Sequence, residues 1–118
     1  MTAGTSLLLD LDAHPVIAHR GASAFAPENT LVGFERAAAF GAEAFELDVH
    51  VTADDQPVVI HDATLDRTTD RRGAIATMTY AAIREADAGA RFTTDRGATF
   101  PFQGRGIRVQ MAVTGWTF

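Results

Sequence analysis

The sequence lacks cysteine, lysine and any long apolar run, and each absence excludes a class of protein. Without cysteine there is no disulfide scaffold, no thiolate zinc site and no cysteine nucleophile. The basic residues are all arginine, and the net charge of −5 disfavours general nucleic-acid binding. No stretch approaches the ~20 apolar residues that a membrane helix requires. The N-terminus has no basic region of the kind that begins a secretory signal, so we expect a cytoplasmic chain.

The length and composition are those of one ordinary globular domain. The chain has 118 residues, of which 47% are hydrophobic and 21% charged. Short apolar runs and their turn residues predict a strand at 16–18, a helix that starts at Asn29 or Thr30 and ends at Gly41, and strands at 44–51 and 57–60. The first strand is expected to be buried. This order indicates an α/β fold whose first strand-helix-strand unit is parallel.

The second half of the chain has a different character. Residues 62–108 are rich in Arg, Thr and Gly and contain one predicted helix, 80–87, for which Thr79 is a suitable N-cap. This segment is expected to run over the sheet as an excursion and not to continue it.

Ionisable side chains stand at the ends of the three predicted strands: His19 and Arg20, Glu46 and Asp48, and His61 and Asp62. In parallel α/β proteins, ligands bind at the carboxyl ends of the strands. Glu46 and Asp48 are two residues apart on one strand, so both point to the same side, where Mg²⁺ or Ca²⁺ would offset their repulsion. His19 and His61 suit a general acid and base, and Arg20 suits a phosphate. The combination predicts a site that hydrolyses a phosphate ester.

Each of these residues taken alone has a simpler structural interpretation. Paired carboxylates usually form the solvated face of a strand, and single histidines usually make structural hydrogen bonds. Asp62 suits a turn, and Arg67 with the threonines after it suits a polar turn more than an anion contact. It is the coincidence of complementary chemistry at three strand ends that favours a site. His14 precedes the first strand at its opposite end and is assigned no role.

A set of short motifs resembles the glycerophosphodiester phosphodiesterase family, in order and at family-like spacing from about residue 15 to about residue 109. They are His19-Arg20-Gly21, Pro27-Glu28-Asn29-Thr30, Gly41-Ala42-Glu43, Glu46-Leu47-Asp48-Val49, His61-Asp62 and Leu65-Asp66-Arg67-Thr68-Thr69. The set is specific, although no single motif in it is.

The resemblance implies a fold, a reaction and a role for each site residue. The fold would be a partial TIM barrel, (β/α)₈, comprising the first three strands and an insertion at 62–108. The reaction would be metal-dependent hydrolysis of glycerophosphodiesters to sn-glycerol 3-phosphate and an alcohol. His19 and His61 would be catalytic, Arg20 would bind the substrate phosphate, and Glu46 and Asp48 would bind Mg²⁺ or Ca²⁺. Spider-venom phospholipases are similar in fold and site, and attack by water or by the glycerol hydroxyl both stay open.

The length departs from the family pattern. A TIM barrel typically takes ~250 residues, and residues 110–118 do not match the family's continuation. We therefore expect a truncated family member, residues 1–118 being the N-terminal portion of the domain. Three barrel strands would leave open edges and an uncovered apolar face that invite self-association. The alternative function is a catalytically incomplete fragment that binds a cation or phosphate or pairs with another chain.

Overall fold

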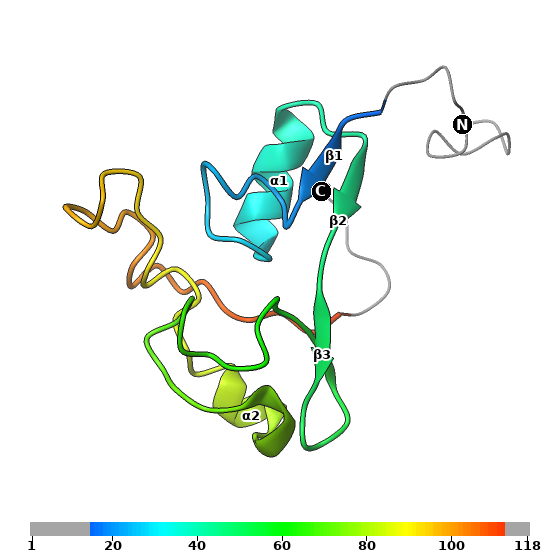
Figure 1. Ribbon diagram of the computed structural model, residues 1–118, viewed down its shortest axis with the longest axis vertical. Coiled ribbons are helices and arrows are strands. Elements are labelled where there is room, and N and C mark those ends of the chain that lie inside the picture. The colour runs from blue at the N-terminus through cyan, green and yellow to red at the C-terminus, as the bar shows by residue number, and fades with distance from the viewer. Residues whose placement is uncertain (1–14, 113–118) are drawn as a thin grey trace, which may run out of the picture.

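The computed structural model describes residues 15–112, which form two small sheets and short helices (Figure 1). The elements in chain order are β1 (Ile17–His19), α1 (Leu31–Ala39), β2 (Ala44–Glu46), β3 (Val49–Val51), β4 (Pro57–Val59), the 3₁₀-helix η2 (Ile75–Thr77) and α2 (Tyr80–Ile83). One sheet joins β1 to β2, and the other joins β3 to β4.

The first unit is the parallel β-α-β crossover that the sequence predicts. β1 and β2 pair in parallel, with Ile17 opposite Ala44, and His19 opposite Glu46. Side chains alternate across a strand, so Phe45 lies on the opposite face from Glu46. There its ring packs 5.5 Å from that of Phe34 on α1. The face that carries Phe45 is therefore packed against α1, and Glu46 points away from the helix.

The helix α1 begins and ends as the sequence indicates. Of the two candidate caps, it is Thr30 whose hydroxyl accepts a hydrogen bond from Gly33 N–H, at 3.2 Å. After the last turn, Gly41 adopts φ +90° and its N–H donates to Ala38 O. Neither α1 nor α2, the two α-helices in residues 15–112, is long and apolar enough to cross a membrane.

The strand predicted over 44–51 is split into two strands with different partners. β2 pairs with β1, and after Leu47 and Asp48 the chain resumes as β3, which pairs antiparallel with β4. Val49 lies opposite Val59, and the hairpin turns through residues 52–56. The second sheet is thus a hairpin, and β4 brings the chain back so that Ile60 N–H donates to Asp48 O, two residues after β2 ends.

Residues 60–109 fold beside this hairpin and share one apolar cluster with β4. The cluster's buried members are Val58, Ile60, Leu65, Ile75, Ile83, Ala86, Ala88 and Val109. α2 is shorter than the predicted helix 80–87, although Thr79 caps it as expected. Residues 110–112 pair beside β4, where Val59 N–H donates to Gln110 O and Ala112 N–H to Pro57 O. The rest of the expected unmatched tail, and His14, lie outside the described residues.

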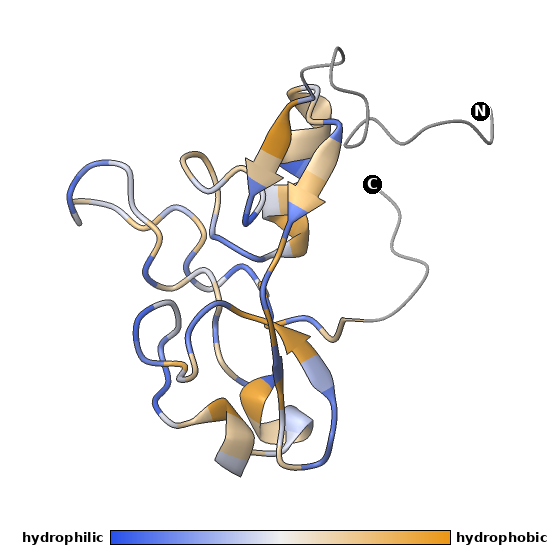
Figure 2. Ribbon diagram, turned by 45° about the vertical axis from the view of Figure 1, so that its right-hand side comes forward, coloured by the Kyte–Doolittle hydropathy of each residue, from blue (hydrophilic) through white to orange (hydrophobic). Residues whose placement is uncertain are grey.

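The expectation of a buried first strand is wrong. Val16 is 58% exposed and Ile17 is 52% exposed. The reason is that, within residues 15–112, only β2 lies beside β1, so its outer edge and part of its apolar surface stay uncovered. Figure 2 shows this apolar strand and the change to polar residues at the arrowheads of both β1 and β2.

The turn after β1 requires glycine at position 21 for two reasons. Gly21 has φ +82°, and a Cβ there would lie 2.9 Å from the carbonyl carbon of Gly33 in α1. Gly41 also has a positive φ, but a Cβ there would meet nothing within 4 Å. A side chain at position 21 would therefore bring both backbone strain and a steric clash, whereas one at position 41 would bring backbone strain alone.

We predict that Gly21→Ala lowers the unfolding free energy by about 2–4 kcal/mol, because both costs apply. Gly41→Ala, which bears only the left-handed backbone cost, should lose about 1 kcal/mol. Urea unfolding of both variants measures the difference. Equal losses at the two positions would contradict the predicted contact between the turn and α1.

Candidate active site

The register of the first sheet creates the first contact of the site. His19 and Glu46 are partners across β1 and β2, so their side chains emerge side by side. His19 Nε2 lies 3.1 Å from Glu46 Oε2. The geometry is not that of a hydrogen bond, and Glu46 Oε2 is buried with no hydrogen-bond donor among the described residues.

Arg20 turns the chain at the end of β1 and directs its guanidinium group at two carboxylates. Its N–H donates to Glu46 O at 2.8 Å, which extends the ladder by one bond, and its φ of +57° then reverses the direction of the chain. The guanidinium lies 3.5 Å from a carboxylate oxygen of Asp48 through Nε and 3.5 Å from Glu28 through Nη1. Arg20 thus stands between the end of the second strand and the loop before α1.

Asn29 fixes the position of Asp48. Its side-chain amide donates to Asp48 Oδ2 at 3.0 Å, and its Oδ1 accepts from Asp48 N–H at 3.4 Å. Asn29 is only 3% exposed and has φ +54°. Two neighbouring non-glycine residues, Arg20 and Asn29, are therefore held in the left-handed region, and such strain concentrates at functional sites.

Asp48 is kept ionised by its neighbours. Burial of this carboxylate would raise its pKa, but the hydrogen bond from Asn29 and the positive charges of Arg20 and of protonated His61 outweigh that effect, so the pKa is lowered.

His61 reaches the site because the hairpin brings the chain back. Ile60 N–H donates to Asp48 O at 3.0 Å, so the residue after β4 lies beside the residue before β3. His61 Nδ1 lies 2.9 Å from Asp62 Oδ1, and the His61 carbonyl accepts a hydrogen bond from His50 Nε2 at 2.8 Å. The antiparallel pairing of β3 and β4, and not a third parallel strand, therefore places this histidine.

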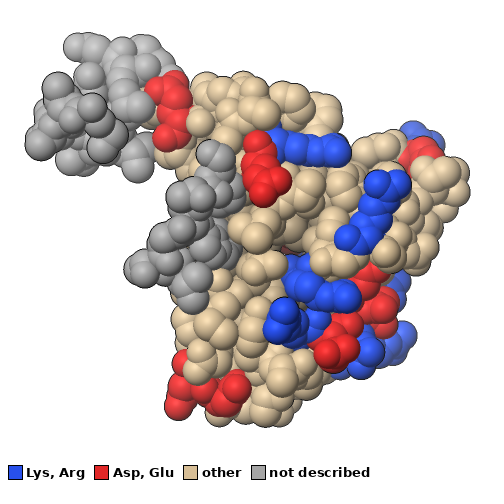
Figure 3. Space-filling view, turned by 180° about the vertical axis from the view of Figure 1, so that it is seen from behind, with Lys and Arg blue, Asp and Glu red and all other residues tan. Residues whose placement is uncertain are grey.

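Arg67 bridges two carboxylates that are far apart in the sequence. It donates to Asp62 through Nε (2.8 Å) and Nη2 (3.0 Å), and to Glu28 through Nη2 (2.6 Å) and Nη1 (3.2 Å). The hydrogen bond from Arg67, and then the one from His61, lowers the pKa of Asp62 far below its usual range. The hydrogen bonds to Asp62 and then to Glu28 raise the pKa of Arg67. Acidic and basic side chains adjoin on one face of the molecule in Figure 3.

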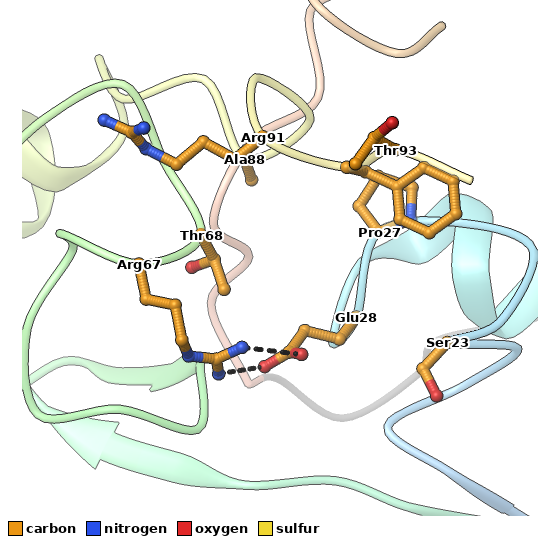
Figure 4. A pocket seen from close by; sticks show the side chains of 9 residues that line it. Ser23, Pro27, Glu28, Arg67, Thr68, Ala88, Arg91 and Thr93 are labelled. Atoms are coloured by element: carbon orange, nitrogen blue, oxygen red, sulfur yellow. Dashed lines mark hydrogen bonds and ion pairs between the residues drawn. The ribbon is translucent and has the colours of Figure 1, made fainter. Parts of the chain in front are cut away.

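A cavity of about 230 Å³ opens beside this ion pair. Its walls come from the loop before α1, the turn at 67–68 and residues 88–93 (Figure 4). Glu28 and Arg67 meet at one side of it, and Pro27, Ala88 and Thr93 line other parts. The cavity lies next to Glu28, which also contacts Arg20, so it adjoins the site.

The structure brings the five predicted site residues together. Two direct contacts link four of them, His19 with Glu46 and Arg20 with Asp48, and His61 directly follows Ile60, whose N–H donates to Asp48 O. Their catalytic, substrate and metal roles stay predictions.

Four further residues complete the network in positions that sequence reasoning assigned to caps and turns or left without a role: Glu28, Asn29, Asp62 and Arg67. All four belong to the short motifs that carry the family resemblance, which is the signal that could have found them.

The carboxylates Glu46 and Asp48 offer a limited set of metal ligands. Within residues 15–112 there is no group of three or more His, Asp or Glu side chains arranged to hold a metal ion. Mg²⁺, however, is commonly held by one or two carboxylates with water and substrate phosphate completing its shell. The buried Glu46 Oε2, which lacks a donor, beside the ionised Asp48 fits that mode of binding.

The fold is that of part of a TIM barrel of the phosphodiesterase type, with polar residues at its strand ends. The model of the glycerophosphoryl diester phosphodiesterase family matches residues 19–111. The chain belongs to this family, as the resemblance implied.

Similar proteins include curated and solved members of the same family. A glycerophosphodiester phosphodiesterase of Caldanaerobacter subterraneus is 51% identical over 77 residues, covering 65% of this chain and 32% of that protein. The crystal structure of an Agrobacterium tumefaciens enzyme of that name matches with a TM-score of 0.72 at 42% identity, over 83% of this chain and 39% of the other.

An Oleispira antarctica phosphodiesterase, solved in complex with the product sn-glycerol-3-phosphate, matches with a TM-score of 0.69 at 35% identity, over 83% of this chain and 36% of that one. The chain spans about a third of the length of the curated relatives that it matches.

We predict that Arg67→Gln lowers the unfolding free energy by about 1–2 kcal/mol at neutral pH, because Asp62 and Glu28 lose a shared partner at a half-exposed site. The folded-state pKa of Asp62 is depressed. The stabilisation that ionised Asp62 gives to the folded state is therefore complete at pH values above its unfolded pKa, near 3.8. That stabilisation is lost as the pH falls through the folded-state pKa of Asp62.

Urea unfolding at about pH 6 and about pH 3 tests this linkage. The difference between wild type and Arg67→Gln should shrink at the lower pH. Arg72→Gln is the matched control, because Arg72 is exposed and its side chain makes no hydrogen bond or ion pair within residues 15–112. A difference that is the same at both pH values would show that Asp62 is not the titrating partner.

Proposed function

We propose that the site hydrolyses glycerophosphodiesters to sn-glycerol 3-phosphate and an alcohol, in lipid or glycerol phosphodiester metabolism. The observation that carries this proposal is the meeting of two histidines, one arginine and two carboxylates at the end of a parallel β-α-β unit. The family of the chain supports it, as does the product bound in the Oleispira relative.

The side chains suit distinct parts of the reaction. The exposed His19 and His61 can divide the proton transfers, one taking the proton of the attacking hydroxyl and the other protonating the departing alcohol oxygen. Arg20 offers its planar guanidinium to the phosphate oxygens. Because Arg20 is already held by Asp48 and Glu28, it is oriented before the substrate arrives.

We propose Glu46 and Asp48 as ligands of a divalent cation, Mg²⁺ or Ca²⁺. Glu46 Oε2 is buried without a hydrogen-bond donor, and Asp48 on the same strand end is kept ionised, so a cation there would offset the repulsion of the two carboxylates. When bound, such an ion would polarise the phosphoryl group and neutralise its developing charge. The chain's own contribution is to keep Asp48 ionised through Asn29 and Arg20.

The remaining proposals concern the whole chain. We propose residues 62–108 as the expected insertion; their buried residues, Leu65 and Ile83 among them, pack in one apolar cluster with Val58 of β4. A cytoplasmic location and the absence of nucleic-acid partners stay predictions from the sequence.

The second candidate function is an incomplete fragment that binds a cation or phosphate or pairs with another chain. The exposed apolar residues of β1 favour this candidate. Self-association through the open edge of β1 is the form of pairing we propose.

We predict that His19→Ala and His61→Ala each lower the rate of glycerol 3-phosphate release from glycerophosphocholine by about 10²-fold or more, because each removes a proton-transfer group. The measurement is a product assay on purified chain with Mg²⁺ or Ca²⁺ added. His14→Ala, which lies outside the described residues and has no assigned role, is the matched control. Activity retained in both single variants would refute the acid-base assignment, and no release from well-folded wild type would favour the fragment.

We predict that Glu46→Gln and Asp48→Asn each weaken Mg²⁺ or Ca²⁺ binding by about tenfold or more, because a hard cation needs the carboxylate charge. Isothermal titration calorimetry with the metal alone measures this without an activity assay. Asp55→Asn makes the same chemical change at an exposed position of the β3–β4 turn and should bind the metal as wild type does. Equal affinity in all three variants would place the cation elsewhere.

A further inference from the structure

We propose that Asp62 is a positioning residue that holds His61 in one tautomer, with the proton on Nδ1, and that Arg67 holds Asp62 in place for this task. The inference rests on the proposed function, in which His61 transfers protons. It adds two residues that sequence reasoning assigned to turns.

The tautomer follows from the contact between His61 and Asp62. Nδ1 and Oδ1 are 2.9 Å apart, which is hydrogen-bond distance. The hydrogen bond from Arg67 holds the pKa of Asp62 far below its usual range, so this carboxylate is ionised and can only accept. Nδ1 must therefore carry the proton, and in the neutral ring Nε2 is left as the basic atom.

The His61 ring has no competing partner in the part of the chain that the structure describes. The other hydrogen bond of this residue involves its backbone carbonyl, which accepts from His50 Nε2 at 2.8 Å. That bond fixes the main chain and leaves the ring to Asp62. Nε2 is thus free to exchange a proton with a substrate oxygen.

Arg67 determines where the Asp62 carboxylate lies. Its Nε and Nη2 donate to the two oxygens of Asp62 at 2.8 and 3.0 Å, a planar two-point contact that a lysine cannot make. Oδ1 accepts from both Arg67 and His61, so the arginine holds the same oxygen that orients the ring.

The Arg67 guanidinium also contacts Glu28, the residue beside the proposed phosphate-binding Arg20. It donates to both oxygens of Glu28, at 2.6 and 3.2 Å, and Glu28 lies 3.5 Å from Arg20. The Arg67 guanidinium therefore contacts both the carboxylate that orients His61 and the carboxylate that contacts Arg20. Thr69 fixes the turn that presents Arg67, because its hydroxyl donates to Leu65 O and accepts from Arg71 N–H.

The proton balance of this arrangement is simple. When His61 acts as base, its Nε2 takes the proton of the attacking hydroxyl, and the ring becomes a cation with protons on both nitrogens. Asp62 stays ionised and stabilises that cation without taking the proton, as a carboxylate does in other histidine-carboxylate pairs. When the ring acts as acid, Nε2 returns the proton to the leaving oxygen.

The experiment is ¹⁵N NMR of the histidine rings in the full chain, at a pH where His61 is neutral. We expect Nδ1 of wild-type His61 to show the shift of a protonated nitrogen and Nε2 that of an unprotonated one. Asp62→Asn should move the ring toward the opposite tautomer, because the side-chain amide can donate to Nδ1. A wild-type ring that is mainly protonated at Nε2 would overturn the proposal, whatever the variants do.

Two variants separate the role of Arg67 from general damage to the fold. Arg67→Lys keeps the charge but not the two-point contact, and should reduce the Nδ1-protonated population of His61; an unchanged population would overturn the role of Arg67. Asp66→Asn is the matched control, since its carboxylate accepts from Gly73 N–H and contacts neither His61 nor Arg67. A tautomer shift of equal size in this control would overturn the specific role of Asp62.

Activity provides a second readout that distinguishes this inference from the proposed function. Asp62→Asn should lower kcat by about 10²-fold and leave KM nearly unchanged, because proton transfer and not binding is impaired. A KM effect without a kcat effect would overturn the positioning role. If wild type shows the expected tautomer but no hydrolysis, the proposed function fails while the geometric inference stands.

Discussion

The parallel pairing of β1 with β2 is the constraint on which the site depends. Its register sets His19 directly opposite Glu46, and the next backbone bond, from Arg20 N–H to Glu46 O, carries the ladder into the turn. Side chains alternate along a strand, so a shift of one residue would place Phe45 or Leu47 opposite the histidine. The same register directs Phe45 at Phe34 of α1, so packing on one face determines chemistry on the other.

The turn that leaves β1 is strained, and the surrounding contacts hold it. Arg20 and Asn29 both have positive φ, and Asn29 N–H donates to Arg20 O at 2.9 Å, so the two strained residues support one another. Gly21 lets the turn lie against Gly33 of α1. Strain of this kind costs of order 1–3 kcal/mol per residue and persists only where neighbours fix it. Here it aims one guanidinium and one amide at Asp48.

Much of the fold could be predicted from the sequence because it depends on local patterns. The cap at Thr30, the end of α1 at Gly41 and the polar strand ends all follow from nearby residues. The partners of strands do not, because pairing depends on the path of the chain between them. The hairpin that returns His61 to Asp48 is such a case, and so is the contact of Arg67 with Glu28, 39 residues away. Apart from the family motif around it, no propensity or periodicity of the nearby residues distinguishes that arginine from one in a polar turn.

The net charge of the site residues determines which ions must accompany an anionic substrate. Four carboxylates, of Glu28, Glu46, Asp48 and Asp62, face two guanidinium groups, of Arg20 and Arg67. With both histidines neutral, the network has two more negative than positive charges, and a phosphodiester would add another. Like charges at such distances repel strongly in a partly buried site. An anionic substrate is therefore compatible with this site only if cations accompany it, either as protons on His19 and His61 or as a divalent ion between Glu46 and Asp48.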